Sequence, residues 1–318
     1  MFNRPTVLVL GAGASVPFGF PTGLGLVAQI CNANYRNHES ISPLKEQFPL
    51  FQDALRKSGL SSIDSFLENR VDDFAEIGKR TICREILSIE RYGKSVSKKE
   101  TYLKPVYESN LFGFDGNWYR QLRDLLGLDT DKFGANLAII TFNYDRSLEQ
   151  FIFTSIKNSF KLSDEECASL LSRIKIVHVY GSVGELDWQN LDSGIEYGAD
   201  PKSEAIISRA ANNINVIRKD EIPHTFEQAT DLLQQAQFIY FFGFGFNEDN
   251  IKRLELKKMG KNANTAGTRL GIRGETWRRV MHHLKISSDG GSRNFDENYW
   301  QDIPIDDYIR DIGFRNLV

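Results

Sequence analysis

The sequence predicts an α/β protein: a Rossmann-like parallel sheet with helices on both faces, plus a helical insertion subdomain. The first observation is an apolar run, Val7 to Leu10, that leads directly into Gly11 and Gly13. Such short apolar runs are typical of strands buried on both faces. Ligands of open α/β sheets bind outside the carboxyl ends of the strands, so we expect several strand ends to meet at one ligand. Three further apolar runs end in glycine or compact polar residues, at 137–140, 174–177 and 238–242.

The turn after the first run is rich in glycine. Its sequence, Gly11-Ala12-Gly13-Ala14-Ser15-Val16, departs from a complete G-x-G-x-x-G because the last position is valine. Glycine lets a backbone amide approach a phosphate that no Cβ blocks, and a following helix points its positive end at the same anion. The turn therefore predicts a dinucleotide pyrophosphate site, with a purely structural tight turn as the alternative. We expect a helix from Thr22, its N-cap, to Asn34.

The chain of 318 residues is long enough for one large domain, or for one domain with an inserted subdomain. Residues 35–130 lose the strand character and carry apolar residues at helical spacing. We therefore expect a helical insertion at 37–130 that forms one wall of a ligand cleft. Residues 1–36 and 131–318 would together form the Rossmann-type domain.

Charge and composition bear on the partners. The formal net charge is −3, so no global positive field recruits nucleic acid. The basic stretch from Arg91 to Lys104 is interpreted as a solvated loop, with a partner or nucleic-acid patch as the alternative. No apolar run approaches the length of a membrane span, and the N-terminus enters the first strand without a signal-peptide pattern.

The cysteines are few and scattered. Cys31, Cys83 and Cys167 are odd in number and have no spacing that suits a disulfide framework or a zinc site. Cys31 lies on the apolar face of the predicted helix after the first turn, so we interpret it as a core residue. A reducing cytoplasm fits this pattern best, and no metal site is expected.

The second half of the chain predicts helices that alternate with strands. Ser163 to Glu166 is typical of a capping box, and a helix is expected at 226–235. Another helix should begin near Asn247. After it we expect a final short strand at 268–272 and a helix at 276–284.

Residues 289–318 are predicted to be loop-rich. Their aromatic residues stand among acidic ones, which is typical of interface anchors, although the same residues could pack back on the sheet. These aromatic residues are Phe295, Tyr299, Trp300 and Tyr308.

Four motifs, in this order, resemble those of the sirtuin-like NAD-binding domains of bacterial anti-phage defence proteins. They are Gly-Ala-Gly-Ala-Ser from Gly11, Thr-x-Asn-Tyr-Asp from Thr141, His-x-x-Gly-Ser from His178 and Gly-Phe-Gly-Phe-Asn-x-Asp from Gly243. Each motif follows a predicted strand, and the set extends to residue 250. The resemblance implies that NAD is bound as a substrate.

Asn143 and His178 are the predicted catalytic pair. A carboxamide has a donor and an acceptor without charge, so Asn143 can hold a ribose hydroxyl or a water beside a cationic substrate. Its alternative role is a cap of the following helix. Imidazole titrates near neutrality, so His178 can act as a base, with a satisfied core histidine as the alternative. In the resembling family, asparagine and histidine at these positions are the catalytic pair.

The resemblance also implies a set of NAD-contacting positions. Asp145 matches the position at which sirtuins contact the nicotinamide carboxamide, and its alternative is an exposed acid at a helix N-terminus. Asn247 is equally interpreted as a helix cap. The full set is Gly11, Ala12, Gly13, Ser15, Thr22, Asp145, Gly181, Gly243, Gly245 and Asn247.

The sequence departs from protein-deacylating sirtuins in two places. Those enzymes carry Asp-Phe-Arg after Gly-x-Pro, whereas Pro21 is followed here by Thr22-Gly23-Leu24. They also hold a four-cysteine zinc ribbon, which three scattered cysteines cannot form.

We therefore expect water to be the acceptor, which predicts an NAD glycohydrolase that yields nicotinamide and ADP-ribose. The alternatives are a non-catalytic NAD- or ADP-ribose-binding module, an NAD-dependent deacylase and an NAD-dependent oxidoreductase.

Unrestrained NAD hydrolysis would kill the host cell, so such an enzyme needs restraint. The resemblance implies NAD depletion in anti-phage defence beside a partner such as a HerA-type ATPase or a short Argonaute. We expect a homo-oligomer that joins such a partner and makes no direct contact with nucleic acid or membrane.

Overall fold

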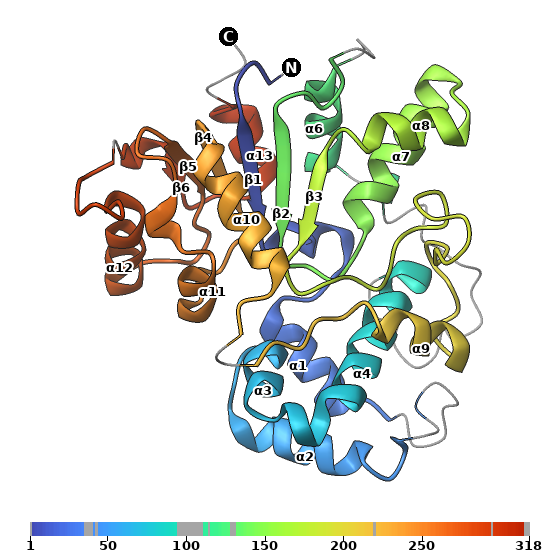
Figure 1. Ribbon diagram of the computed structural model, residues 1–318. Coiled ribbons are helices and arrows are strands. Elements are labelled where there is room, and N and C mark those ends of the chain that lie inside the picture. The colour runs from blue at the N-terminus through green and yellow to red at the C-terminus, as the bar shows by residue number, and fades with distance from the viewer. Residues whose placement is uncertain are drawn as a thin grey trace.

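The computed structural model describes residues 2–34, 41, 44–93, 111–113, 115–127, 132–218, 221–293 and 295–314. Within these ranges, six strands form one sheet in the order β3-β2-β1-β4-β5-β6. All neighbouring pairs are parallel, which confirms the predicted Rossmann-like architecture (Figure 1). The strands are β1 (Thr6–Leu10), β2 (Leu137–Thr141), β3 (Lys175–His178), β4 (Phe238–Phe242), β5 (Asn264–Thr268) and β6 (Trp300–Gln301).

The register places the ends of four strands at one level. Leu10 pairs with Thr141 of β2 on one side and with Phe242 of β4 on the other. Thr141 in turn pairs with His178, the last residue of β3. The chain goes from β1 outward to β2 and β3, and then returns to place β4 on the other side of β1. This reversal is the switch point at which open α/β sheets bind ligands.

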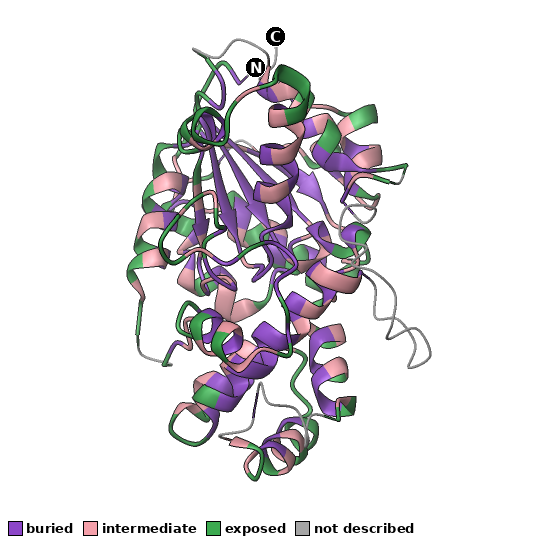
Figure 2. Ribbon diagram, turned by 90° about the vertical axis from the view of Figure 1, so that its right-hand side faces the viewer, coloured by how far each residue is buried: buried purple, intermediate pink, exposed green. Residues whose placement is uncertain are grey.

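Helices cover both faces of the sheet, as predicted. On one face, α6 (Trp118–Leu126) packs between α7 (Ser147–Phe160) and α13 (Ile305–Asp311). The opposite face carries α10 (His224–Gln235), which contacts β3 (Figure 1). Beside these lie α8 (Asp164–Leu171), with the predicted Ser163–Glu166 capping box, and α12 (Gly274–Lys285). Figure 2 shows the strands as a buried layer between helices.

A second group of helices, the helical lobe, lies beyond the carboxyl ends of the strands (Figure 1). Its α1 and α9 come from outside residues 37–130, whereas α6 from within that range packs on the sheet. The division into a 37–130 insertion and a 1–36/131–318 domain stays a prediction. The helices of the lobe are α1 (Gly23–Asn32), α2 (Phe48–Ser58), α3 (Ile63–Asn69), α4 (Val71–Tyr92) and α9 (Glu204–Ala211).

Local signals placed several elements correctly. Thr22 caps α1 by accepting a hydrogen bond from the Gly25 amide, and Cys31 is buried on this helix. Two short 3-10 turns, Ala12–Ala14 and Val16–Phe18, separate β1 from α1. The basic stretch predicted at 91–104 lies outside the described residues from position 94 onward.

The prediction for the C-terminal part was wrong in two respects. The expected strand at 268–272 is β5, which ends at Thr268. Its sequence lacks a bulky apolar run because the strand approaches β4 closely: a Cβ on Gly267 would lie 2.1 Å from the Phe241 carbonyl oxygen. The expected loop at 289–318 contains β6 and α13.

The aromatic residues of that tail pack back on the sheet. Trp300 and Tyr308 are buried, with ring centroids 5.6 Å from Phe241 and 5.5 Å from Phe242, respectively. Phe295 is half-buried, and its ring is stacked on Trp300. Interface anchors at Trp300 and Tyr308 are therefore ruled out, because these side chains belong to the core.

Candidate functional site

A pocket lies between the ends of β1 and β2 and the helical lobe. Its lining residues surround about 470 Å³ of space, part of which is open to solvent. The segment after β2 contributes residues 142–145, the first turn contributes Ala12 and Ser15, and the lobe contributes the N-terminal ends of α1 and α3. The acidic side chains among its described lining residues are Asp64 and Asp145, and burial raises the pKa of both carboxyl groups. A cationic ligand group beside them would favour their ionised forms.

The glycines of the first turn are explained by backbone packing. The Gly11 amide donates to the Phe242 carbonyl, and the Gly13 amide donates to the Gly243 carbonyl, each at 3.0 Å. A Cβ on Gly11 would lie 2.5 Å from the Gly243 oxygen, and one on Gly243 would lie 2.1 Å from the Ala14 amide nitrogen. The turns after β1 and β4 thus press against each other, and the structural alternative accounts for Gly11, Gly13 and Gly243.

Asn143 stands two residues beyond the end of β2 with its side chain buried. Its Nδ2 donates to the Gly11 carbonyl at 3.1 Å and to the Ser15 hydroxyl at 2.9 Å. A carbonyl only accepts, so Gly11 fixes which end of the amide is nitrogen. The Oδ1 atom is buried and has no hydrogen-bond partner among the described residues. Asn143 therefore does not cap α7; it keeps a buried, unpaired acceptor beside the two cavities that the residue lines.

Asp145 is a buried acid at the start of α7. Its Oδ1 accepts a hydrogen bond from the Ser147 amide at 3.2 Å and another from the Ser147 hydroxyl. Burial raises the pKa of Asp145, although its hydrogen bonds to Ser147 and Ser15 oppose this effect. The side chain is only 6% exposed, so Asp145 is not the solvent-exposed helix acid of the alternative interpretation.

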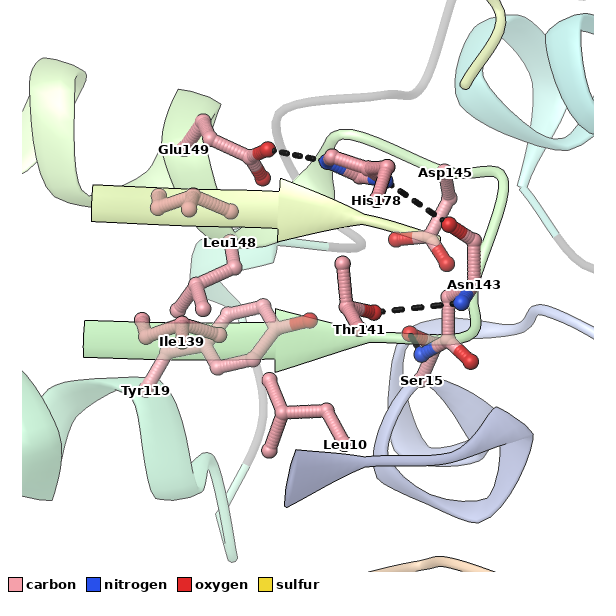
Figure 3. Close-up of a pocket in the computed structure, with 11 residues that line it drawn as sticks. Leu10, Ser15, Tyr119, Ile139, Thr141, Asn143, Asp145, Leu148, Glu149 and His178 are labelled. Carbon is pink, nitrogen blue, oxygen red and sulfur yellow. Dashed lines mark hydrogen bonds and ion pairs between the residues drawn. The ribbon is translucent and has the colours of Figure 1, made fainter. Parts of the chain in front are cut away.

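His178 ends β3 and both of its ring nitrogens are engaged. Nδ1 lies 2.8 Å from the Asn143 carbonyl oxygen, and Nε2 lies 2.7 Å from Glu149 Oε1 (Figure 3). Burial alone would lower the pKa of His178. The neighbouring Glu149 carboxylate, the Asn143 carbonyl and Asp145 outweigh burial, and the net effect raises the pKa. The contacts of His178 therefore favour the protonated form of its ring in this conformation.

A narrow cavity brings the predicted catalytic pair together. Asn143, His178, Asp145 and Ser15 all line it, together with Glu149 (Figure 3). Ser15, Asn143 and Asp145 also line the larger pocket, so they form the boundary between the two spaces. The structure therefore joins the ends of β1, β2 and β3 around one small polar cluster.

Of the other predicted positions, Ala12 and Thr22 line the larger pocket. The rest are not among the described residues that line either cavity: Gly11, Gly13, Gly181, Gly243, Gly245 and Asn247. Gly181 has φ +76° and pairs with Ile214, so its conformation and packing require glycine. Asn247 caps α11 (Glu248–Arg253) by accepting from the Asp249 amide, as the cap interpretation expected. Gly245 is exposed, and a Cβ there would meet nothing within 4 Å.

Sequence reasoning missed two residues of this region. Glu149 lies in the first turn of α7, directly after the Asn143 motif, and that position was the available signal. Trp118 of α6 is buried, and its Nε1 donates to the Ala14 carbonyl at 2.9 Å, which supports the first turn from behind. No sequence pattern relates Trp118 to that turn.

The described residues contain no group of three or more histidine, cysteine or acidic side chains placed to hold a metal ion. None of the described helices is both long and apolar enough to cross a membrane.

Comparisons with known proteins gave one kind of match. No protein-family model matches the chain, and no curated protein sequence matches it. Among solved structures, the chain is similar to Sir2 in complex with the inhibitor EX-527, 2′-O-acetyl-ADP-ribose and a deacetylated p53 peptide. The match has a TM-score of 0.36 and 14% sequence identity, and it covers 97% of this chain and 92% of that chain. At this level of similarity, the match carries no conclusion about the present chain.

Proposed function

We propose that this chain binds NAD at the carboxyl ends of β1, β2 and β3 and hydrolyses its nicotinamide–ribose bond. The observation that carries the proposal is the Asn143 side chain, whose Oδ1 is buried without a hydrogen-bond partner in the described structure. A buried acceptor left unpaired costs about 1–3 kcal/mol, so a site that keeps one is expected to fill it with a ligand donor. A ribose hydroxyl or a bound water supplies such a donor.

The charge of the pocket supports a cationic substrate. NAD carries its positive charge on the nicotinamide ring, and the sugar becomes oxocarbenium-like as the bond breaks. The Asp64 and Asp145 carboxyl groups line the larger pocket, and no lysine or arginine is among the described residues that line it. The phosphates would then depend on backbone amides, such as those at the N-terminus of α1, where Thr22 and Gly23 reach the pocket.

The reaction balances without a metal ion. The C1′–N bond breaks, both of its electrons go to the nicotinamide nitrogen, and nicotinamide leaves as a neutral molecule. A water oxygen bonds to C1′, and the water proton goes to the neutral form of His178. Asn143 Oδ1 orients the water or the ribose hydroxyl, while Asp145 stabilises the positive charge on the sugar.

The experiment is incubation of the purified chain with NAD and chromatography of the products. We expect nicotinamide and ADP-ribose in equal amounts, and a loss of at least about 10²-fold in Asn143→Ala and His178→Ala. Matched controls are Asn158→Ala and His224→Ala, which change exposed residues of α7 and α10. Full activity in the Asn143→Ala variant would overturn the proposal.

Each rival function predicts a different result, and each has its own measurement. A binding module would bind NAD in calorimetry and leave it intact. A deacylase would consume NAD only with an acyl-lysine peptide present, and an oxidoreductase would produce the absorbance of reduced cofactor. We favour hydrolysis because Pro21 is followed here by Thr22-Gly23-Leu24 in place of the deacylase motif.

The motif resemblance extends the proposal to a setting. In this setting, NAD depletion serves anti-phage defence, and the chain is a homo-oligomer restrained by a partner such as a HerA-type ATPase or a short Argonaute. Light scattering of the purified chain tests the oligomer. A strict monomer with full NADase activity would argue against this arrangement.

A further inference from the structure

The His178–Glu149 contact joins two elements that the sequence does not relate. His178 is the last residue of β3, and Glu149 is in the first turn of α7. Both side chains are largely buried, with 15% and 7% of their surface exposed, respectively. Nε2 faces Glu149 Oε1 at 2.7 Å, while the opposite nitrogen, Nδ1, faces the Asn143 carbonyl at 2.8 Å (Figure 3). The ring is thus fixed from both sides.

The two contacts of the His178 ring require a definite number of protons. A backbone carbonyl only accepts, so Nδ1 must carry a hydrogen. A carboxylate also only accepts, and a hydrogen bond between Nε2 and Oε1 therefore needs one further proton on either atom. Without that proton, the lone pair of Nε2 would face a carboxylate oxygen at 2.7 Å. In the observed conformation, His178 and Glu149 therefore share one proton in addition to the one on Nδ1.

We infer that Glu149 is a positioning residue for His178: it fixes the imidazole ring and holds a proton on the Nε2 side. His178 can accept a proton from substrate only after this shared proton has left, because Nδ1 remains committed to the Asn143 carbonyl. The proton leaves to solvent as the pH rises. The catalytic consequence rests on the function proposed above, but the contact can be tested without it.

Other groups around the ring are consistent with Glu149 as its main partner. From the end of β2, Asp145 adds a second negative charge that favours the protonated ring. From α6, Tyr119 lines the same cavity, and its hydroxyl is neutral at physiological pH because burial raises its pKa. The remaining polar groups of this cavity, Ser15, Thr141 and Asn143, are uncharged. Glu149 is the carboxylate in direct contact, so its removal should change the titration of His178 most.

The test is an NMR titration of the histidine side chains in the full chain and in Glu149→Gln. The chain has five histidines, so the His178 signal can be assigned by its loss in His178→Gln. In the wild type at pH 7, we expect both His178 ring nitrogens to be protonated. In Glu149→Gln, the neutral amide can donate to Nε2, and His178 should lose its proton at a lower pH than in the wild type.

A matched control and a conservative variant sharpen the result. Glu227→Gln removes the carboxylate of an exposed histidine–glutamate pair, His224–Glu227, and should leave the titration of His178 unchanged. Glu149→Asp keeps the negative charge, so His178 in this variant should lose its proton at a pH closer to the wild-type value than in Glu149→Gln. In NAD hydrolysis, the acid limb of kcat/KM should move to lower pH in Glu149→Gln, and Glu149→Ala should lose roughly 10²-fold in kcat through misplacement of the ring.

Two outcomes would overturn the inference. One is a wild-type His178 that is neutral at pH 7, with its single proton on Nε2; this measurement needs no variant. The other is a folded Glu149→Gln chain in which His178 titrates as in the wild type. If NAD stays intact in every variant while the titration moves as expected, the proposed function fails and the role of Glu149 stands.

Discussion

Asn143 Nδ2 donates to the Ser15 hydroxyl at 2.9 Å, which ties the end of β2 to the turn after β1. Ser15 is itself only 3% exposed. The contact uses one of the two amide protons, and the Gly11 carbonyl takes the other at 3.1 Å. With both protons committed, the amide plane is fixed, and Oδ1 is held as a buried acceptor without a partner among the described residues. Ser15 thus determines how precisely Asn143 presents its acceptor.

Replacing Ser15 by alanine should loosen this amide without removing it. We expect a loss of about 1 kcal/mol in the free energy of unfolding, the net worth of a typical hydrogen bond. The rate of NAD hydrolysis should fall by more than the factor that corresponds to this loss of unfolding free energy, because the Asn143 acceptor is no longer held in its orientation. Urea denaturation and the NAD assay measure the two effects. Ser193→Ala, in an exposed turn, is the control and should change neither.

The sequence predicted that several strand ends meet because its signals are local. Each of β1 to β4 contains a short apolar stretch, and glycine or compact polar residues lie at or just after its end. Parallel strands place such ends on one edge, so the meeting of Asn143 with His178 follows from the fold class.

The parts that escaped prediction depend on contacts between distant segments. β5 was misplaced because Gly267 replaces bulky residues where β5 approaches Phe241. Glu149 was missed because its pairing with His178 depends on how α7 sits against β3, which no periodicity encodes. The glycines at 11 and 243 were found, but their packing against each other was not, since sequence cannot show which backbone fills the space beside a glycine.

Gly243 and Gly245 are a matched pair of glycines: replacing Gly243 tests backbone packing, and replacing Gly245 tests the approach of a ligand. Gly243→Ala should be strongly destabilising, because its φ is +60° and its Cβ would lie 2.1 Å from the Ala14 amide nitrogen. A cost of about 1–3 kcal/mol is expected from the backbone strain alone. Gly245→Ala should leave thermal stability nearly unchanged, because nothing lies within 4 Å of its Cβ.

Calorimetry with NAD gives the second half of that comparison. If Gly245 lies beside bound NAD, Gly245→Ala should weaken binding in a chain of normal stability. Unaltered affinity would show that Gly245 is merely an exposed loop residue. Equal stability of the two alanine variants would contradict the packing role of Gly243.

Arg146, directly after the Asn143 motif, forms a buried ion pair that should be a major stabilising contact of the lobe. Its Nη2 lies 2.6 Å from Glu90 Oε2 on α4, and its Nη1 donates to the Ile195 carbonyl at 2.6 Å. Removing one partner leaves a buried charge, so Arg146→Met should cost about 3–5 kcal/mol of unfolding free energy.

The double variant tests the electrostatic origin of that cost. Arg146→Met with Glu90→Gln should be less destabilised than the sum of the single variants, because the stranded carboxylate is gone. Arg310→Met breaks an exposed pair with Asp307 and is the control, with no measurable change expected. Additive effects at 146 and 90, measured by urea denaturation, would show that the two side chains are not coupled.

The raised pKa of His178 also predicts how stability depends on pH. Folding raises the pKa above 6.5, its ordinary value, chiefly because Glu149 and the Asn143 carbonyl favour the protonated ring despite burial. The folded chain then holds a proton more tightly than the unfolded chain does. This contribution is fully present below pH 6.5 and is lost as the pH rises through the folded pKa.

The stability difference between wild type and Glu149→Gln should therefore shrink from mildly acidic to alkaline pH, as followed by urea denaturation at a series of pH values. Glu227→Gln, at the exposed His224 pair, should show no comparable trend. A difference that stays constant with pH would mean that Glu149 stabilises the fold by packing alone.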